Sequence, residues 1–232
     1  MKARAIASRT ATAWGPYNLP IMTTSLPLFD DLHKPQPLQL PDADLRLVRR
    51  FYEEDEAQRH FAALKEELAW RHEPITLWGK QYLQPRLTAW YGEPGTDYTY
   101  SGLRMEPLPW TPRVAGIKAA IEALCGQRFN SVLANLYRDE RDSVGWHSDD
   151  EPELGKTPFI ASLSLGETRI FKLRHKTRKE IKPVSFELGN GSLLLMGGRT
   201  QQHWLHAVEK ERQTRGARIN LTFRLIQTST RR

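Results

Sequence analysis

The chain has 232 residues, of which 39% are hydrophobic and 26% are charged, and its formal net charge is +7. This composition is typical of a globular protein of one or two domains, and no apolar run reaches the roughly 20 residues that a membrane-spanning helix needs. The single cysteine, Cys125, excludes an internal disulfide and zinc sites built from two or four cysteines of one chain. A cytoplasmic protein is therefore expected.

The first part of the chain predicts an extended arm followed by helices. Residues 1–41 are rich in Pro, Ser and Thr and show no sustained period, which predicts a mobile N-terminal arm. Apolar residues between Asp44 and Trp70 recur at helical spacing and predict one helix or two short ones. A further helix is expected to begin at Pro112, with Thr111 as its N-cap, and to end at Gly126.

After residue 126 the pattern changes to about eight short apolar runs separated by turn residues. Runs of this kind predict strands, and two helices followed by many short strands favour an α+β, mainly β protein. The expected architecture is a two-sheet jelly roll, or double-stranded β-helix, with helices packed on one side. Within it, the Gly-Asn-Gly of ELGNGSLLLM predicts a β-hairpin.

The stretch GWHSDDEPELG brings a histidine and several carboxylates together. In a strand, His147 and Asp149 point to the same side, because side chains alternate with a period of two. Two histidines and one carboxylate form a facial set that leaves positions open on Fe(II). A distant strand must then supply the third ligand, and HWLHAV offers His203 and His206. Taken alone, H-x-D is weak evidence for a metal site, because many solvated surface loops contain it.

The segment RINLTFR alternates polar and apolar residues, with an arginine at each end. Its polar face could be exposed to solvent. If it is buried, Arg218 and Arg224 need anions, since a buried unpaired charge is costly, and two forked guanidinium groups suit a small dicarboxylate. Asn135 and Tyr137, in ANLY, could add an amide and a hydroxyl to the same pocket.

Taken in order, N-x-Y, H-x-D, a late histidine and R-x-N-x-T-x-R resemble the AlkB family of Fe(II)- and 2-oxoglutarate-dependent dioxygenases. The resemblance runs from about Leu77 to Ile226 and is closest to the subgroup that acts on double-stranded DNA. It implies iron ligands at His147, Asp149 and His206. It also implies that 2-oxoglutarate is bound by Asn135, Tyr137, Arg218, Asn220, Thr222 and Arg224, with Arg218 and Tyr137 at the distal carboxylate and Arg224 and Asn135 nearer the iron.

By the same resemblance, the expected activity is oxidative demethylation of 1-methyladenine and 3-methylcytosine in DNA. Dioxygen and 2-oxoglutarate would be consumed, and formaldehyde, succinate and CO2 released. One alternative is a demethylase of RNA or single-stranded DNA, and another is a non-catalytic nucleic-acid-binding module. The protein is expected to be a monomer without a membrane partner, associated with the nucleoid in a bacterium or nuclear in a eukaryote. Residues 42–232 would form one catalytic domain, with a nucleotide-recognition lid over about residues 74–110.

Chemistry on a paired base requires that the base leave the stack, so aromatic walls and a wedge are expected. The resemblance implies stacking by Tyr98 and Tyr100, a wedge at Trp78, support of the distorted strand by Arg86, and reading of the base by Glu151. Without it, the aromatic residues would be assigned to the core and Glu151 to the surface. The stretch FKLRHKTRKEIK has six Lys/Arg and one acid, and predicts phosphate contacts. The expected contacts are made by Lys172, Arg174, Lys176, Arg178 and Lys179.

Overall fold

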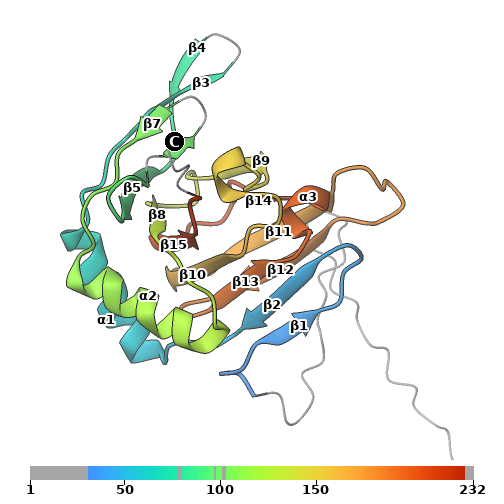
Figure 1. The fold of residues 1–232 in the computed structure, drawn as a ribbon, viewed down its shortest axis with the longest axis horizontal. Coiled ribbons are helices and arrows are strands. Elements are labelled where there is room, and N and C mark those ends of the chain that lie inside the picture. Colours follow the sequence, from blue (N-terminus) through green and yellow to red (C-terminus); the bar gives the residue numbers. More distant parts are fainter. Residues whose placement is uncertain (1–30, 78–79, 97, 101–102, 228–232) are drawn as a thin grey trace, which may run out of the picture.

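The computed structural model describes residues 31–77, 80–96, 98–100 and 103–227 (Figure 1). Its main body is a pair of antiparallel sheets that face each other, with two helices on the outer face of the larger sheet. Among these residues, no helix is long and apolar enough to cross a membrane. The predicted mainly β jelly roll with helices on one side is confirmed.

The larger sheet contains seven strands. Four of them, with four strands of the other sheet, come from the eight runs predicted after residue 126. The other three come from earlier in the chain and extend both edges. In spatial order the strands are β1 (Gln36–Leu38), β2 (Asp44–Val48), β13 (Leu193–Gly197), β10 (Ile160–Gly166), β15 (Arg218–Arg224), β8 (Ser131–Tyr137) and β5 (Leu87–Gly92).

The smaller sheet contains β12 (Val184–Leu188), β11 (Arg169–His175), β14 (Trp204–Val208) and β9 (Val144–His147), in that order. Two hairpins lie outside both sheets, within the range expected for the lid. They are formed by β3 (Pro74–Leu77) with β4 (Lys80–Leu83), and by β6 (Tyr98–Tyr100) with β7 (Leu103–Met105). Figure 1 shows the β3–β4 hairpin projecting from the body of the protein.

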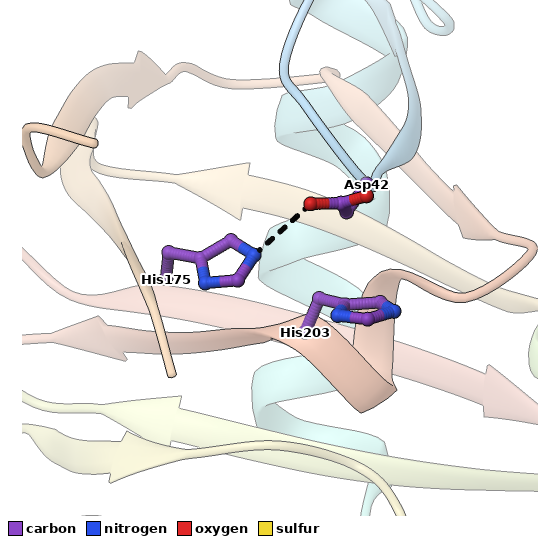
Figure 2. A group of neighbouring side chains, drawn as sticks. All are labelled: Asp42, His175 and His203. Carbon is purple, nitrogen blue, oxygen red and sulfur yellow. Dashed lines mark ion pairs between the residues drawn. The ribbon is translucent and has the colours of Figure 1, made fainter. Parts of the chain in front are cut away.

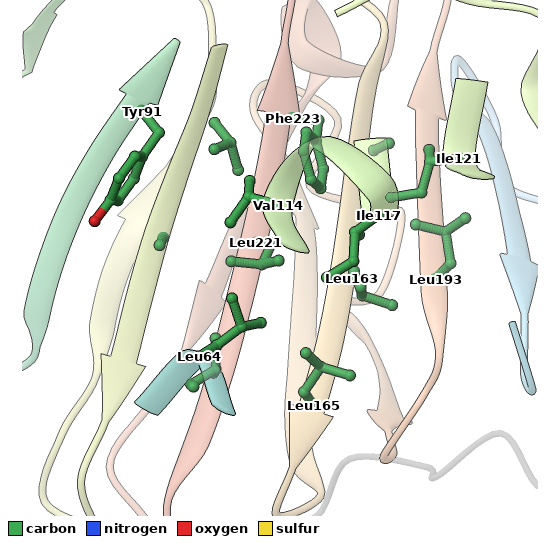
Figure 3. Packing of buried hydrophobic residues seen from close by; sticks show 14 of the residues in the cluster. Leu64, Tyr91, Val114, Ile117, Ile121, Leu163, Leu165, Leu193, Leu221 and Phe223 are labelled. Carbon is green, nitrogen blue, oxygen red and sulfur yellow. The ribbon is translucent and has the colours of Figure 1, made fainter. Parts of the chain in front are cut away.

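Two long helices, α1 (Glu54–Glu67) and α2 (Pro112–Cys125), cover the large sheet. The predicted ends of α2 are confirmed: the Thr111 side chain accepts the backbone N–H of Val114, and Gly126 takes the left-handed conformation at φ 69°. Leu64 of α1 and apolar residues of α2 pack on the sheet, as Figure 3 shows. The residues at the centre of this core include Val114, Ile117, Ile121, Leu163, Leu193, Leu221 and Phe223.

The segment expected to begin a helix at Asp44 is a strand instead. In β2, Leu45 and Leu47 are buried and Arg46 is exposed, which is the period of two of a strand. Pairing with β1 and β13 on its two sides satisfies its backbone groups, and this long-range pairing overrides the local helical spacing. Because β1 is part of the sheet, residues 36–38 do not belong to the arm predicted for residues 1–41; residues 1–30 lie outside the described part of the chain.

The predicted Gly-Asn-Gly hairpin is also wrong. Gly189, Asn190 and Gly191 connect β12, which pairs with β11 in the small sheet, to β13, which pairs with β10 and β2 in the large one. The turn therefore carries the chain from one sheet to the other. A turn signature reports the local backbone conformation but not which strands pair, so the sequence alone could not distinguish the two connections.

Gly191→Ala is expected to destabilise the fold. Gly191 has φ +74°, and a Cβ there would lie 2.4 Å from the backbone oxygen of Tyr52. The left-handed conformation alone costs a non-glycine residue about 1–2 kcal/mol, and the clash adds to this cost. Gly116→Ala is the control, because Gly116 is an exposed helical position with open space around it and should gain about 0.5–1 kcal/mol. Urea denaturation of both variants would test these opposite signs.

Candidate metal and 2-oxoglutarate site

A cavity lies between the inner faces of the two sheets. Its lining includes all nine residues predicted to bind iron or 2-oxoglutarate. They come from β8, β9, β14, β15 and the segment that follows β9, so the jelly roll collects them from widely separated parts of the chain. The nine are Asn135, Tyr137, His147, Asp149, His206, Arg218, Asn220, Thr222 and Arg224.

The three predicted metal ligands converge at one end of this cavity. His147 on β9 and His206 on β14 are register partners, and their ring centroids are 4.2 Å apart. The Nε2 atoms of both rings lie 4.0 Å from the carboxylate oxygens of Asp149. His203, the other candidate, belongs to α3 (Thr200–His203) and is not part of this group.

The hydrogen bonds and pKa values of this group suit a metal ion. His147 Nδ1 lies 2.8 Å from the carbonyl oxygen of Gly145 and must donate a proton to it, which leaves the lone pair on Nε2 facing Asp149. Burial lowers the pKa of His147, and burial with the nearby His147 ring lowers the pKa of His206 to about 3. Both rings are therefore neutral near pH 7, the form in which imidazole binds metals.

Asp149 is ionised although only 1% of it is exposed. Burial favours the neutral acid, but the Arg224 guanidinium and the two histidines lower the pKa of Asp149 to about 2. Arg224 Nη2 donates to Asp149 Oδ1 at 2.8 Å. Arg224 thus lies at the metal end of the cavity, where the resemblance placed it.

A second group, Asp42, His175 and His203, also brings possible metal ligands together (Figure 2). His175 Nδ1 accepts the backbone N–H groups of Arg178 at 3.0 Å and Thr177 at 3.3 Å. An acceptor nitrogen carries no proton, so the proton of neutral His175 is on Nε2, 3.3 Å from Asp42. This tautomer cannot offer Nε2 to a metal. The His147 group has the opposite tautomer, which is why we assign the metal site there.

The polar face of β15 points into the cavity. Of the two positions that the sequence left open for this face, solvent or the interior, the structure has the interior one. The strand lies between β8 and β10, and its register sets Arg218 beside Tyr137 and Asn220 beside Asn135. Asn220 and Thr222 already have partners: the Asn220 amide donates to Ser162 Oγ at 2.8 Å, and Thr222 Oγ1 donates to Asn220 Oδ1 at 2.9 Å. They can therefore shape the pocket without requiring a ligand.

Arg218 has unsatisfied hydrogen-bonding capacity. Its guanidinium carbon lies 5.1 Å from the centroid of the Tyr137 ring, and Nη2 donates to Ser164 Oγ at 2.9 Å. Nε and Nη1 are buried and form no hydrogen bond with the described residues, and no described carboxylate forms an ion pair with Arg218. Burial lowers the pKa of Arg218. A buried cation with two such donors fits one carboxylate of 2-oxoglutarate.

The residues predicted to handle a flipped base are only partly described. Trp78 lies outside the described residues, between β3 and β4. Tyr98 and Tyr100 belong to β6, whose backbone alone is described. Arg86 is 4% exposed, lines the cavity, and donates from Nε to Asn135 Oδ1 at 2.7 Å. A contact with a DNA strand does not suit this position, so Arg86 is better placed to orient Asn135. Glu151 is half-buried at the start of a 3-10 helix (Pro152–Leu154).

Most of the cations predicted to contact phosphates have partners within the protein. Lys176 pairs with Asp150 at 2.8 Å, Lys172 with Glu209, and Arg178 with Asp42 and Glu180. The guanidinium of Arg174 lies 4.5 Å from the centroid of the Trp146 ring. Exposed Lys179 forms no ion pair with another described residue. This stretch is therefore less available to phosphates than its charge count implies.

Two buried residues near the site gave no signal in the sequence. Arg169 donates four hydrogen bonds, to Glu211 and to the carbonyls of Asp139, Asp142 and Glu209, and so connects the segment after β8 with the segment after β14. Gln201 of α3 contacts the backbone of Asp149. Both act through partners distant in the chain, and no motif or period reveals such contacts.

Known proteins resemble the chain along most of its length. A family model described as the 2OG-Fe(II) oxygenase superfamily matches residues 44–224. The human alpha-ketoglutarate-dependent dioxygenase alkB homolog 3 is 51% identical over 158 residues, which cover 65% of this chain and 54% of that protein. The Bos taurus protein of the same name is 47% identical over 78% of this chain and 65% of its own length.

A second group of relatives is covered more completely. The Mus musculus DNA oxidative demethylase ALKBH2 is 38% identical over 180 residues, which cover 74% of this chain and 75% of that protein. A solved structure described as "The structure of OsALKBH1" has a TM-score of 0.55 at 21% identity, covering 82% of this chain and 100% of that one, and shows the shared fold.

The chain spans between about half and two thirds of the length of the alkB homolog 3 relatives, 54% of the human protein and 65% of the bovine one. The match to the superfamily model nevertheless covers most of the chain and all nine residues of the cavity group. The ALKBH2 match covers three quarters of that relative. The chain belongs to the AlkB family of the 2OG-Fe(II) oxygenase superfamily.

Proposed function

We propose that the protein is a dioxygenase that uses Fe(II) and 2-oxoglutarate to demethylate N-methylated bases of nucleic acid, in particular 1-methyladenine and 3-methylcytosine. The observation that carries the proposal is that one cavity contains both the possible metal ligands, His147, Asp149 and His206, and a buried arginine, Arg218, with N–H donors unbonded among the described residues. The names of the relatives, a dioxygenase and a DNA oxidative demethylase, support the reaction and its substrate class.

In this proposal, His147, Asp149 and His206 hold the iron through two neutral imidazoles and one carboxylate. The bound iron and 2-oxoglutarate supply oxidation by dioxygen, in which one oxygen atom enters succinate and the other is added to the methyl group. The hydroxymethyl product loses formaldehyde and leaves the unmethylated base, and CO2 is the remaining product.

The protein's own residues bind and orient the cosubstrate. Arg218, with Tyr137 beside it, receives the distal carboxylate, since its free donors are buried at the end of the cavity away from Asp149. Arg224 keeps Asp149 ionised and lies near the other carboxylate. Arg86 holds the Asn135 side chain through its carbonyl oxygen, so that the amide N–H groups remain available to the ligand.

The experiment that tests the proposal is anaerobic reconstitution of the full chain with Fe(II) and 2-oxoglutarate, followed by oxygen and oligonucleotides containing 1-methyladenine or 3-methylcytosine. Mass spectrometry of the bases and quantification of succinate give the result. Loss of the methyl groups with matching succinate is expected. No succinate with intact, salt-sensitive oligonucleotide binding would instead favour a non-catalytic binding module.

Double-stranded DNA is the preferred substrate in our proposal, and Trp78 is the wedge that replaces the flipped base. Lys176, Arg178 and Lys172 form ion pairs within the protein, so they give less support to a contact with the complementary strand of a duplex. For this reason RNA or single-stranded DNA is the second candidate substrate. The wedge is therefore the feature to test.

Trp78→Ala is expected to slow demethylation of a duplex about tenfold or more, because an unstacked step left unfilled costs a few kcal/mol. Single-stranded substrate should be processed at the wild-type rate, since no stacking has to be replaced. Tyr82→Ala is the matched control: Tyr82 is on the same hairpin, 47% exposed, and outside the turn. Initial rates on both substrates decide, and equal losses on duplex and single strand would remove Trp78 from this role.

A further inference from the structure

Asp149 is the one member of the metal triad whose backbone is not held by a strand. β9 ends at His147, and Asp149 lies in the irregular segment after it. His147 and His206, by contrast, are fixed to each other through the pairing of β9 with β14. The carboxylate of Asp149 is held by Arg224, but that contact does not determine where its backbone lies.

The missing support comes from α3. Gln201 Oε1 accepts the backbone N–H of Asp149 at 3.0 Å, and both residues are only 1% exposed. The other end of the amide is also occupied, because Nε2 lies 3.5 Å from the sulfur of Met196. The Gln201 side chain is thus held at both ends, and its carbonyl oxygen is aimed at one backbone N–H that no strand satisfies.

This contact closes a ring around the metal site. α3 continues directly into β14, so Gln201 is five positions before His206 in a continuous, ordered segment. From His206 the ring runs across the strand pair to His147, two residues on to Asp149, and back to Gln201 through the hydrogen bond. Any shift of the Asp149 loop relative to β14 must break that bond, and the unpaired N–H would remain buried.

We propose that Gln201 is a positioning residue for the metal site, which sets the distance between Asp149 and the two histidines before a metal arrives. The inference rests on the metal site of the proposed function but not on its substrate or reaction. Residues that orient metal ligands typically contribute 10–100-fold to metal affinity. Gln201 would do so through a backbone amide, whereas Arg224 acts on the carboxylate.

The test is Gln201→Met, which keeps the length and volume of the side chain but removes the acceptor. The probe is Mn(II) alone, titrated calorimetrically into metal-free full-length protein without nucleic acid. The Kd for Mn(II) is expected to rise about 10–100-fold. Gln202→Met is the matched control: Gln202 is the adjacent, exposed residue of α3, and its side chain contacts the Lys156 carbonyl and Arg199. Its Kd is expected to stay at the wild-type value.

Hydrogen exchange of the peptide that contains Asp149, in the metal-free state, gives a second readout that needs no metal. Exchange should be faster in Gln201→Met than in wild type and unchanged in Gln202→Met. If Gln201→Met does not fold, Gln201→Asn replaces it, because the acceptor is drawn back by one methylene while the polarity is kept. Absence of Mn(II) binding by the wild type would contradict the metal site itself. Wild-type affinity in the Gln201 variants, or equal weakening by Gln202→Met, would overturn the positioning role.

Discussion

His147→Ala is expected to abolish metal binding and turnover while the protein remains folded. The His147 side chain is 26% exposed, so its removal leaves no deep cavity in the core. Its Nε2 lone pair is nevertheless one of only three donors that the triad offers. Because loss of a residue that merely orients a ligand costs up to about 100-fold in affinity, loss of a ligand should cost more than that. Calorimetric titration with Mn(II), succinate release and circular dichroism measure the three properties.

His203→Ala is the control for this prediction. It is the same substitution, made three positions from His206, in the group that contains Asp42 and His175. The hydrogen bonds of His175 place its ring proton on Nε2, which leaves no lone pair there for a metal, so Mn(II) affinity and turnover should stay at wild-type values. Metal binding that survives in His147→Ala but is lost in His203→Ala would move the site to the group in Figure 2 and contradict our assignment.

The residues of the cavity could be predicted because short-range patterns and the family resemblance pointed to the same side chains. Alternation with a period of two set Arg218, Asn220, Thr222 and Arg224 on one face of a strand. It also predicted that His147 and Asp149 lie together, although β9 ends at His147 and Asp149 lies in the irregular segment after it. Once the jelly roll forms, those faces must meet, since each sheet has only one inner side. The choice between His203 and His206 needed more than alternation: the resemblance gave it, and the structure separates the two.

The wrong predictions share a different cause, which is dependence on a partner far along the chain. Asp44–Val48 is a strand because β13, about 150 residues later, offers it an edge to pair with. The phosphate contacts of the basic stretch stay a prediction, but the ion pairs of Lys176 with Asp150 and of Arg178 with Asp42 also depend on residues distant in the chain. Local spacing and charge counts do not indicate which distant residues will pair, so these contacts could not be predicted without the structure.

Arg218→Met is expected to have opposite effects on ligand binding and on stability. In the absence of ligand, Arg218 is a buried cation that donates a hydrogen bond to Ser164 Oγ and has two donors, Nε and Nη1, that reach no acceptor among the described residues. Replacing even a buried ion pair by apolar groups of similar volume is often neutral or stabilising by about 1–4 kcal/mol, and the Arg218 charge has no ionic partner among the described residues. Truncating one member of a buried charge pair, however, costs about 2–5 kcal/mol of binding, or roughly 30-fold to a few thousand-fold in Kd. The variant should therefore melt at a higher temperature than the wild type and bind 2-oxoglutarate far more weakly.

Arg169→Met is the matched control for the predicted gain in stability of Arg218→Met. Arg169 is a second buried arginine beside the same tyrosine, with its guanidinium carbon 5.6 Å from the Tyr137 ring centroid. Unlike Arg218, it is paired with Glu211 and with three backbone carbonyls. Its replacement leaves Glu211 without that partner and should destabilise the protein by about 3–5 kcal/mol.

Thermal melts with Mn(II), with and without 2-oxoglutarate, measure both effects in one experiment. Wild-type protein should gain about 2.7 kcal/mol when 2-oxoglutarate is present at 100 times its Kd, and Arg218→Met should gain almost nothing at the same concentration. Equal destabilisation by Arg218→Met and Arg169→Met would mean that Arg218 is already compensated without a ligand. In that case the unsatisfied donors of Arg218 would not be the cause of 2-oxoglutarate binding, and the cosubstrate would have to be held elsewhere in the cavity.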